Sequence, residues 1–424
     1  MSDIQYQGER MTPFLIEAKD AHERGIVRYD EQGDVHITPP AKETRVVPLS
    51  SQFDLTQATI FGLNERLTSA ATSPVMDESG TTLRELFEAE WEIYSVALEN
   101  TEGPAFDYGW YAWYERQGHL VRYAPAFWHR VVSVASASTL LLDPEKRLRW
   151  QDVRKIYEET VIGVVGCSVG NAIVHASVMD MRPRSVKVAD KSLYKMENIN
   201  RVRLRYDDIV SSQEGREDIM SMGLRKKATV VADQLASIDP FLEIYVYEDG
   251  IQQEHVPAFF DGVRGEPALD ILVEEVDEPR IKLLLREEAR VRGIPVVMAS
   301  DLGSMVQLDI LRYDLDRTLP LTYGSTDDAL RASVDAVYDH PGDRDVFFSF
   351  VDTLVGGAYR QDELERIVNL DAEIPTATII PQLGSTATAG AGLVAETIAR
   401  IRLGYPTPAR VRFNKKMFTL ERIV

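Results

Sequence analysis

Two glycines separated by three residues follow a short apolar run near the middle of the chain. The run is Val161–Val165, and Ser168 lies between Gly166 and Gly170. Glycines at such a turn let the backbone approach a phosphate, and the N-terminus of a following helix favours an anion. Asp190 lies 24 residues beyond Gly166, after a second apolar run, where a carboxylate can accept a ribose hydroxyl. These residues predict a nucleotide-binding β-α-β unit.

The glycine pattern departs from the dinucleotide fingerprint. The stretch from Gly166 to Gly170 is one residue short of G-x-G-x-x-G, and Ser168 stands in place of the middle glycine. The pattern therefore predicts the fold more specifically than the ligand. A tight turn in a Rossmann-like domain that binds no nucleotide stays an alternative.

A polar segment with an Asn-x-Asn-Arg pattern follows Asp190. It reads DKSLYKMENINR and contains Asn198 and Arg201. It lies within a basic stretch, Arg182–Arg205, in which eight Lys and Arg residues are opposed only by Asp190 and Glu197. A charge run is usually a solvated face. Beside a nucleotide-binding turn, it also fits a pocket for a polyanion such as a triphosphate.

These motifs together resemble the ThiF/MoeB/HesA superfamily of ubiquitin-activating-like enzymes. The segment that begins at Asp190 is similar to the family's D-x-D-x-V-x-x-S-N-L-N-R-Q stretch. Further segments follow in the family's order. They are Gly223–Ala228 with Ile238–Pro240 (family G-x-x-K-A…L-N-P-x-V), Leu272–Arg280 (D-x-x-D-N-x-x-x-R) and Gly293–Val297 (G-x-P-x-V).

The resemblance implies a reaction, its cofactors and a set of site residues. The reaction is ATP- and Mg²⁺-dependent adenylation of a carboxylate with release of pyrophosphate, in which the protein positions groups and neutralises charge. The turn of Gly166, Ser168 and Gly170 would hold the nucleotide. By the same resemblance, Asp190 would bind the ribose, and Asp277 would bind Mg²⁺. The phosphates would be bound by Asn198, Arg201 and Lys227.

Two of these assignments leave alternatives open. A family lysine three residues after Gly223 would be Lys226, whereas the distance forward to Asp239-Pro240 favours Lys227. Asp277 follows Glu274 and Glu275. Such an acidic cluster can simply be solvated, but three carboxylates beyond the carboxyl end of a parallel strand also suit a metal.

Several positions depart from the family pattern. The family's second aspartate is Ser192 here, and the Gln that ends its Asn-Arg motif is Val202. In many relatives, a partner subunit supplies an arginine to the active site. The corresponding position in this chain falls near Leu142. Three arginines could replace it: Arg130, Arg147 and Arg149. A non-catalytic nucleotide-binding scaffold therefore stays an alternative, as does an NAD(P)-dependent oxidoreductase.

The chain has one cysteine, Cys167, inside the glycine turn. One cysteine excludes a disulfide framework and a Cys-rich zinc site within the chain. Relatives that form a protein thioester need a cysteine far from the ATP turn, so we expect this chain to stop at the adenylate or to pass it to an outside nucleophile. The expected substrate is the C-terminus of a protein or peptide, including a ubiquitin-like protein, or a small-molecule acid. The family expectation is a homodimer.

The alternation of short apolar runs and amphipathic segments predicts how these residues are positioned. We expect an α/β fold, a Rossmann-like, mostly parallel sheet with helices on both faces, in residues 126–313. A C-terminal α+β segment, 314–424, would complete this adenylation domain. The expected strands are Val161–Val165, Val186–Asp190, Glu243–Tyr247, Leu269–Val273 and Pro295–Ala299; an antiparallel part begins at Val306–Tyr313.

We expect residues 1–125 to form a mixed, partly helical extension that contacts substrate or a second subunit. Thr82–Leu98 has apolar residues at helical spacing. All five Trp lie between residues 91 and 150, within an aromatic-rich part of the chain. Large aromatic residues there favour a core or a subunit interface over a stacking surface.

The overall charge limits the class of partner. The net charge is −20, which disfavours non-specific binding to nucleic acid or to anionic lipid. The first ten residues, MSDIQYQGER, lack the features of a signal peptide, and the longest uncharged run is rich in Thr, Gly and Pro. We therefore expect a cytoplasmic protein with no nucleic-acid or membrane partner.

Overall fold

The computed structural model describes most of the chain from residue 148 onward and short stretches before it. The described residues are 7–29, 35–37, 60–62, 75–76, 82–85, 101–104, 109–114, 119–124, 126, 130, 148–210, 224–263, 265–357 and 382–423. The chain divides into two compact units. The first comprises Met1–Met11, Ala135–Leu235 and Leu242–Val424, and the second comprises Thr12–Val134 and Ala236–Phe241.

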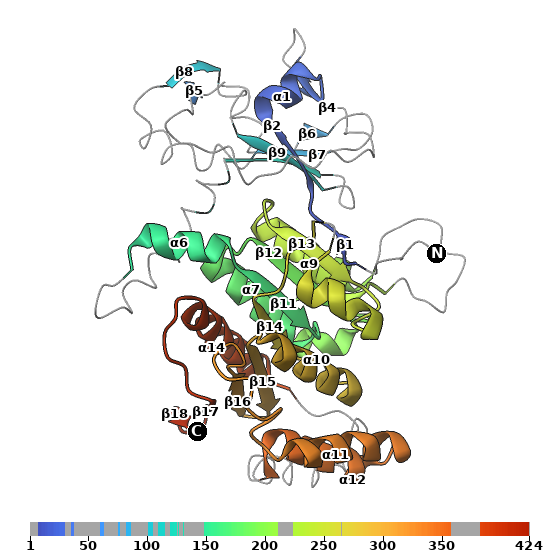
Figure 1. The fold of residues 1–424 in the computed structure, drawn as a ribbon. Coiled ribbons are helices and arrows are strands. Elements are labelled where there is room, and N and C mark those ends of the chain that lie inside the picture. Colours follow the sequence, from blue (N-terminus) through green and yellow to red (C-terminus); the bar gives the residue numbers. More distant parts are fainter. Residues whose placement is uncertain are drawn as a thin grey trace, which may run out of the picture. The chain divides into compact units, whose positions relative to one another are not determined.

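A nine-stranded sheet organises the first unit, in the order β1-β13-β12-β11-β14-β15-β16-β17-β18 (Figure 1). The strands from β13 to β15 run parallel, whereas the remaining neighbours pair antiparallel. The bounds are β1 (Glu9–Arg10), β11 (Val161–Val165), β12 (Ser185–Ala189), β13 (Glu243–Tyr247), β14 (Ile271–Glu274), β15 (Val296–Leu302), β16 (Met305–Leu311), β17 (Arg410–Asn414) and β18 (Thr419–Arg422). The expected α/β fold with a Rossmann-like, mostly parallel sheet is confirmed. The order of the parallel strands reverses between β11 and β14, which is where such sheets bind ligands.

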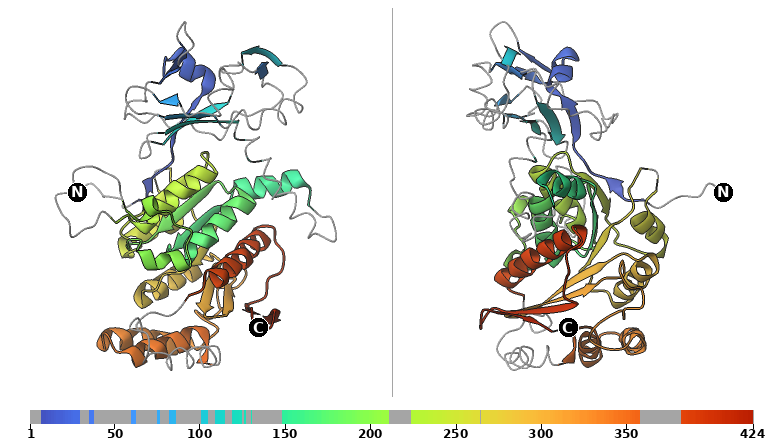
Figure 2. Two further views of the ribbon diagram at one scale, coloured as in Figure 1. Left: turned by 180° about the vertical axis from the view of Figure 1, so that it is seen from behind. Right: turned by 60° about the vertical axis from the view of Figure 1, so that its left-hand side comes forward.

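Helices cover both faces of this sheet. Figure 2 shows α14 and α10 on opposite sides of it. The helices are α6 (Trp150–Glu158), α7 (Val169–Met181), α8 (Tyr206–Ile209), α9 (Lys227–Ile238), α10 (Pro279–Arg292), α11 (Asp327–Asp339), α12 (Arg344–Val355) and α14 (Gly384–Arg402), with short helices η5 (Met196–Asn200), η7 (Gln253–His255) and η8 (Pro257–Asp261). The expected α+β character of the C-terminal segment is also confirmed.

Local sequence explains these elements. All five residues of β11 are buried, as an apolar run covered on both faces requires. Helix α10 starts with Pro279 in its first turn and ends at Gly293, whose φ of 72° is the left-handed conformation that glycine adopts most readily. Helix α12 begins after Asp343, whose side chain accepts hydrogen bonds from the N–H groups of Asp345 and Val346.

The second unit contains a five-stranded sheet in the order β2-β9-β10-β7-β6. Its elements are β2 (Phe14–Glu17), α1 (Ala18–Glu23), β6 (Val75–Met76), β7 (Thr82–Glu85), β9 (Trp110–Tyr114) and β10 (His119–Tyr123), with the pairs β3 (Val27–Tyr29)–β4 (Val35–Ile37) and β5 (Ile60–Gly62)–β8 (Thr101–Pro104). The predicted helix Thr82–Leu98 is therefore wrong at its start, because Thr82–Glu85 forms a strand that pairs with β10. The rest of that predicted helix lies outside the described residues.

The aromatic residues of the second unit that the structure describes belong largely to its core, as predicted. Trp110, Tyr111, Tyr114 and Tyr123 are buried. The Tyr114 and Tyr123 hydroxyls are 2.7 Å apart, and the Tyr114 hydroxyl donates to the carbonyl of Ala236. Within the described residues, no helix is long and apolar enough to cross a membrane.

Candidate functional site

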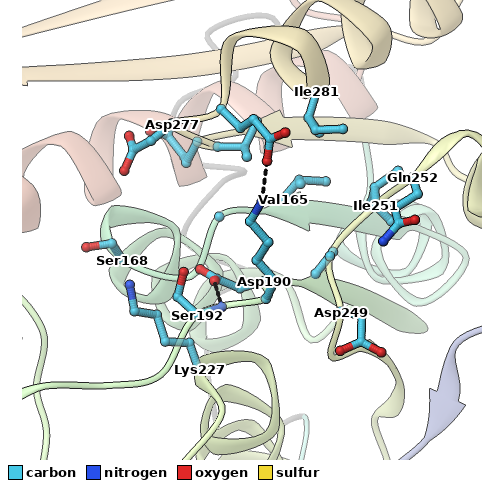
Figure 3. Close-up of a pocket in the computed structure, with 17 residues that line it drawn as sticks. Val165, Ser168, Asp190, Ser192, Lys227, Asp249, Ile251, Gln252, Asp277 and Ile281 are labelled. Carbon is cyan, nitrogen blue, oxygen red and sulfur yellow. Dashed lines mark hydrogen bonds and ion pairs between the residues drawn. The ribbon is translucent and has the colours of Figure 1, made fainter. Parts of the chain in front are cut away.

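A pocket of about 230 Å³ lies at the carboxyl ends of the parallel strands, where the strand order reverses (Figure 3). It is lined by the residues that end or follow four strands, β11, β12, β13 and β14, and by the N-terminal turns of α9 and α10. The lining residues are Val165, Gly166, Ser168, Ala189, Asp190, Lys191, Ser192, Lys227, Asp249, Gly250, Ile251, Gln252, Glu275, Val276, Asp277, Glu278 and Ile281. Figure 3 shows Ser168, Lys227 and Asp277 toward one end, Ile251 and Gln252 toward the other, and Asp190 between them.

The glycine turn has the shape that only glycine permits. Gly166 has a φ of +98°, and a Cβ there would lie 2.3 Å from the carbonyl oxygen of Glu275. A Cβ on Gly170 would lie 2.9 Å from a methyl group of Val164, so this glycine lets α7 approach β11 closely. The predicted turn residues Gly166 and Ser168 both line the pocket, whereas Gly170 supports it from the helix behind.

Asp190 stabilises this turn and also faces the pocket. The N–H of Cys167 donates to its Oδ2 at 2.7 Å, and the N–H of Ser192 donates to its Oδ1 at 2.7 Å. Each carboxylate oxygen has a second lone pair, so both can still accept a hydroxyl. The structure thus places the predicted ribose acid at the centre of the pocket.

Arg201 contacts the turn from the end of η5. Its Nε donates to the Oγ of Ser168 at 2.9 Å, and its NH1 donates to Asn200 Oδ1 at 2.9 Å. Burial lowers the pKa of Arg201, and the charge of Asp277 opposes that shift. The guanidinium therefore lies beside the Ser168 end of the pocket without lining it.

Asn198 lies away from the pocket. It is buried, and its Oδ1 accepts a hydrogen bond from the N–H of Lys195 at 2.9 Å. In this position the side chain closes the first turn of η5, which in turn places Arg201. The structure therefore does not bring Asn198 together with the other predicted phosphate ligands.

The two neighbouring lysines occupy different environments. Lys227, at the N-terminus of α9, lines the pocket, and its Nζ is 5.8 Å from the ring centroid of Tyr194. Lys226 donates to the carbonyls of Lys191 and Glu248, and pairs with Asp249 at 3.3 Å. Of the two lysines that the sequence left open, Lys227 is the one that faces the pocket.

The three carboxylates at and after the end of β14 do not form one cluster. Glu274 is fully buried and points away, where its oxygens accept from Lys282 at 2.6 Å and from Arg286 at 2.9 Å. The interpretation of Glu274, Glu275 and Asp277 as a joint metal site is therefore wrong: Glu274 belongs to a buried ion-pair network. Among the described residues, no group of three His, Cys, Asp or Glu side chains could hold a metal ion.

Glu275 and Asp277 differ in environment although both line the pocket. The N–H of Ala299 donates to Glu275 Oε1 at 2.7 Å, and burial raises the pKa of Glu275 well above its usual range. Asp277 is exposed, and its side chain makes no hydrogen bond with the residues that the structure describes. Asp277 is thus the carboxylate available to a cation at this end of the pocket.

The other sequence candidates lie elsewhere. Cys167 is buried, and burial raises the pKa of its thiol well above its usual range, as is typical of an unreactive thiol. Arg149 pairs with Asp152 on α6, and Arg130 pairs with Asp239 in the second unit. Arg147 and Leu142 lie outside the described residues.

One end of the pocket consists of residues that were not predicted from the sequence. Asp249, Ile251 and Gln252 follow β13, and Ile281 lies in the first turn of α10. An ion pair between Lys191 and Glu278 joins the strand-end segment after β12 to the residue that precedes α10. The rule that ligand groups follow parallel strands would have pointed to the residues after β13, but they carry no motif.

This chain resembles a curated protein in sequence and, more weakly, several solved structures. No family model matches this chain. It is 29% identical over 312 residues to the uncharacterized protein MT1398 of Mycobacterium tuberculosis (strain CDC 1551 / Oshkosh). The match covers 69% of this chain but only 38% of that protein, so the chain spans about four tenths of its relative's length.

Among solved structures, PaaA is similar with a TM-score of 0.44 and 13% identity, over 69% of this chain and 84% of PaaA. The structure of E. coli MccB with AMPCPP and MccA is similar with a TM-score of 0.42 and 12% identity, over 70% of this chain and 74% of MccB. Another MccB structure, described as a microcin C7 biosynthetic enzyme in complex with N-formylated MccA, has a TM-score of 0.41, with 11% identity over 69% of this chain and 72% of that one. Similarities this weak do not assign a function to this chain, so its function is inferred from the residues of the site.

Proposed function

We propose that this protein is a divergent member of the ThiF/MoeB/HesA superfamily that binds ATP in the pocket between β11, β12 and β14 and adenylates a carboxylate. The observation that carries the proposal is the placement of Asp190 between a polar end, with Ser168, Lys227 and Asp277, and an end with Ile251 and Gln252. This order matches the phosphates, the ribose and the base along one mononucleotide.

The hydrogen bonds of the turn favour a mononucleotide over NAD(P). In dinucleotide-binding domains, the backbone N–H groups of the glycine turn bind the pyrophosphate. Here the Cys167 N–H already donates to Asp190, and Ser168, whose hydroxyl accepts from Arg201, stands where the dinucleotide fingerprint has a glycine. Charged side chains, Lys227 and Arg201, would instead neutralise the phosphates.

The charge of the pocket supports a proposed role for a metal ion. Its lining carries the carboxylates of Asp190, Asp249, Glu275, Asp277 and Glu278 against only Lys191 and Lys227. Lys191 is paired with Glu278, and Asp249 with Lys226, so a triphosphate would meet the free carboxylate of Asp277. Mg²⁺ commonly binds one or two carboxylates together with phosphate oxygens and water. Asp277 fits that role, in which the ion would neutralise charge on the leaving pyrophosphate.

The reaction then follows from position and charge. An oxygen of the substrate carboxylate bonds to the α-phosphorus of ATP while the bond from that phosphorus to the pyrophosphate oxygen breaks. The products are an acyl adenylate and pyrophosphate. Arg201, held beside Ser168, and Lys227 would stabilise the negative charge that develops on the phosphates.

The substrate, assembly and location are part of the same proposal. The carboxylate would be the C-terminus of a peptide or of a protein such as a ubiquitin-like one, or a small-molecule acid. The only cysteine of the chain is buried in the turn, so the adenylate would be released or passed to an outside nucleophile. We further propose a cytoplasmic homodimer, as the family resemblance implies.

Calorimetric titration with ATP and Mg²⁺ tests the nucleotide site. We expect the wild-type protein to bind ATP, the variant Arg201→Ala to bind it more weakly, and neither to bind NAD or NADP. Exchange of labelled pyrophosphate into ATP, stimulated by a carboxylate, then tests the reaction. Binding of a nicotinamide nucleotide alone would overturn the proposal. ATP binding without exchange, unaffected by Asp277→Ala, would instead indicate a non-catalytic scaffold.

A further inference from the structure

An ion pair joins the residues that follow β12 to those that follow β14. The Nζ of Lys191 donates to the Oε2 of Glu278, and both residues line the pocket (Figure 3). Strand β11 lies between β12 and β14 in the sheet, and Val165 and Gly166 at its end line the same pocket. The ion pair therefore bridges the carboxyl end of β11, where the strand order reverses.

This ion pair spans the same two strand ends as the proposed nucleotide. Lys191 directly follows Asp190, the proposed ribose acid, and Glu278 directly follows Asp277, the proposed ligand of Mg²⁺. A nucleotide with its ribose on Asp190 and its phosphates beside Asp277 would extend between the same ends. The nucleotide would therefore meet the ion pair and compete with Glu278 for the lysine.

Glu278 is held in place by contacts that do not involve Lys191. It directly precedes Pro279, the first residue of α10, and the hydroxyl of Tyr338 on α11 lies 3.5 Å from its Oε1. The guanidinium of Arg280 in turn lies 3.7 Å from the centroid of the Tyr338 ring. These contacts can persist when the lysine leaves.

Lys191 is the member of the pair that can change its partner. Its side chain is 65% exposed, and among the described residues its Nζ donates a hydrogen bond only to Glu278. Its ammonium group is carried on a flexible four-carbon stem, which can rotate without movement of the backbone. An ion pair this exposed contributes little free energy. A phosphate can therefore replace the carboxylate at small cost.

We propose that Lys191 and Glu278 form a latch across the pocket, in which Lys191 exchanges Glu278 for the polyphosphate when a nucleotide enters. The inference rests on the proposed function and adds a phosphate ligand at a position that the family pattern leaves open. In the open latch, Lys191 joins Lys227 and Arg201 around the phosphates. An uncharged ligand has to open the latch without gaining this contact, whereas ATP gains a charge-assisted hydrogen bond.

Lys191→Met tests the exchange, because ATP and adenosine should respond in opposite directions. Without the lysine the pocket is open to both ligands, but only ATP loses a contact. We expect ATP affinity to fall about tenfold and adenosine affinity to rise about two- to fivefold. Titration calorimetry with Mg²⁺ measures ATP binding, and equilibrium dialysis measures the binding of labelled adenosine.

Lys195→Met is the matched control in the same basic stretch. The Lys195 side chain is 64% exposed and pairs with Glu197, as Lys191 pairs with Glu278, but it does not line the pocket. This variant should change neither affinity by more than about twofold. Equal effects of the two lysine substitutions would indicate a general charge effect and overturn the latch.

Glu278→Gln tests the latch from its other side. Loss of this charge releases Lys191, so the affinity for adenosine should rise about two- to fivefold. In the Lys191→Met background the same substitution should change adenosine affinity by less than about twofold, because no latch remains. Adenosine carries no charge, so the charge of the pocket does not account for such a difference. Equal effects in both backgrounds would overturn the inference.

The remaining outcomes separate the latch from the proposed function. If wild type binds ATP, but Lys191→Met leaves ATP affinity unchanged or fails to raise adenosine affinity, the latch is wrong and the nucleotide site stands. Inorganic tripolyphosphate provides a probe without base or ribose. If it binds more weakly to Lys191→Met while neither ATP nor adenosine binds to wild type, the proposed function is wrong and the exchange of partners stands. Binding of none of the three ligands would overturn both.

Discussion

The Nε of Arg201 donates a hydrogen bond to the Oγ of Ser168 at 2.9 Å. This contact joins the end of η5 to the residue that precedes α7. It brings a guanidinium to the N-terminus of a helix, where an anion is already favoured. Two segments separated by more than thirty residues thus meet at one corner, where a positive charge lies beside the N-terminus of a helix.

Removal of this guanidinium should weaken ATP binding. We expect Arg201→Ala to lower affinity about 10- to 100-fold, because a charge-assisted hydrogen bond to phosphate is lost. Titration calorimetry with Mg²⁺ measures the change. The exposed Arg205, in the same basic stretch, is the control, and Arg205→Ala should leave affinity within about twofold. Equal losses in both variants would indicate a general charge effect instead.

Asp277→Asn should abolish Mg²⁺-dependent exchange while the fold stays intact. Asp277 is exposed, so the unfolding free energy should change by less than about 0.5 kcal/mol. Urea unfolding and pyrophosphate exchange, measured on the same preparation, separate the two effects. Asp328→Asn, at a fully exposed carboxylate, should change neither quantity. Undiminished exchange in Asp277→Asn would exclude this residue as the metal ligand.

Gly166→Ala should disrupt the turn because two penalties add. An alanine at a φ of +98° is strained, and its Cβ would clash with the Glu275 backbone at 2.3 Å. Gly265 provides a matched control, since its φ is +94° and a Cβ there meets nothing within 4 Å. We expect Gly265→Ala to cost about 1 kcal/mol of unfolding free energy and Gly166→Ala clearly more. Equal costs would show that the turn yields to the added methyl group.

Glu274→Ala should destabilise the protein through its buried ion pairs. Loss of this carboxylate leaves Lys282 and Arg286 as uncompensated buried charges, which costs about 3–5 kcal/mol in comparable cases. The partly exposed helical pair Arg154–Glu158 offers the contrast, and Glu158→Ala should cost less than about 1 kcal/mol. Urea unfolding of the two variants tests the difference. A small loss in Glu274→Ala would mean that water reaches this network.

The stability contribution of Asp301 should depend on pH. Burial raises its pKa from 3.8 in the reference state to about 7 in the folded protein. The folded state therefore binds the proton more tightly, so this contribution is fully present below about pH 4 and is lost as pH rises to about 7. The slope should approach about 1.4 kcal/mol per pH unit at most. Urea unfolding across this range should show the slope in wild type and not in Asp301→Asn; parallel curves would contradict it.

Much of the central fold could be predicted from local patterns. Val161–Val165 and Glu243–Tyr247 form strands with the predicted bounds, because short apolar runs buried on both faces are distinctive. Prediction failed at Thr82–Glu85, whose apolar spacing also suits a helix and whose pairing with β10 lies far along the chain. The residues at the Ile251 end of the pocket carry no motif, so only the sheet order reveals them.

The sequence by itself determined the glycine turn, the acid that follows β12 and the order of motifs along the parallel strands. These features are local, because backbone conformation and strand ends depend on neighbouring residues. Tertiary structure decided which charged residues share a site. It directed Glu274 into a buried network, buried Asn198 within η5, and left the side-chain oxygens of Asp301 without a hydrogen-bond partner among the described residues. Such outcomes depend on which distant elements pack together, and residue spacing along the chain does not encode that.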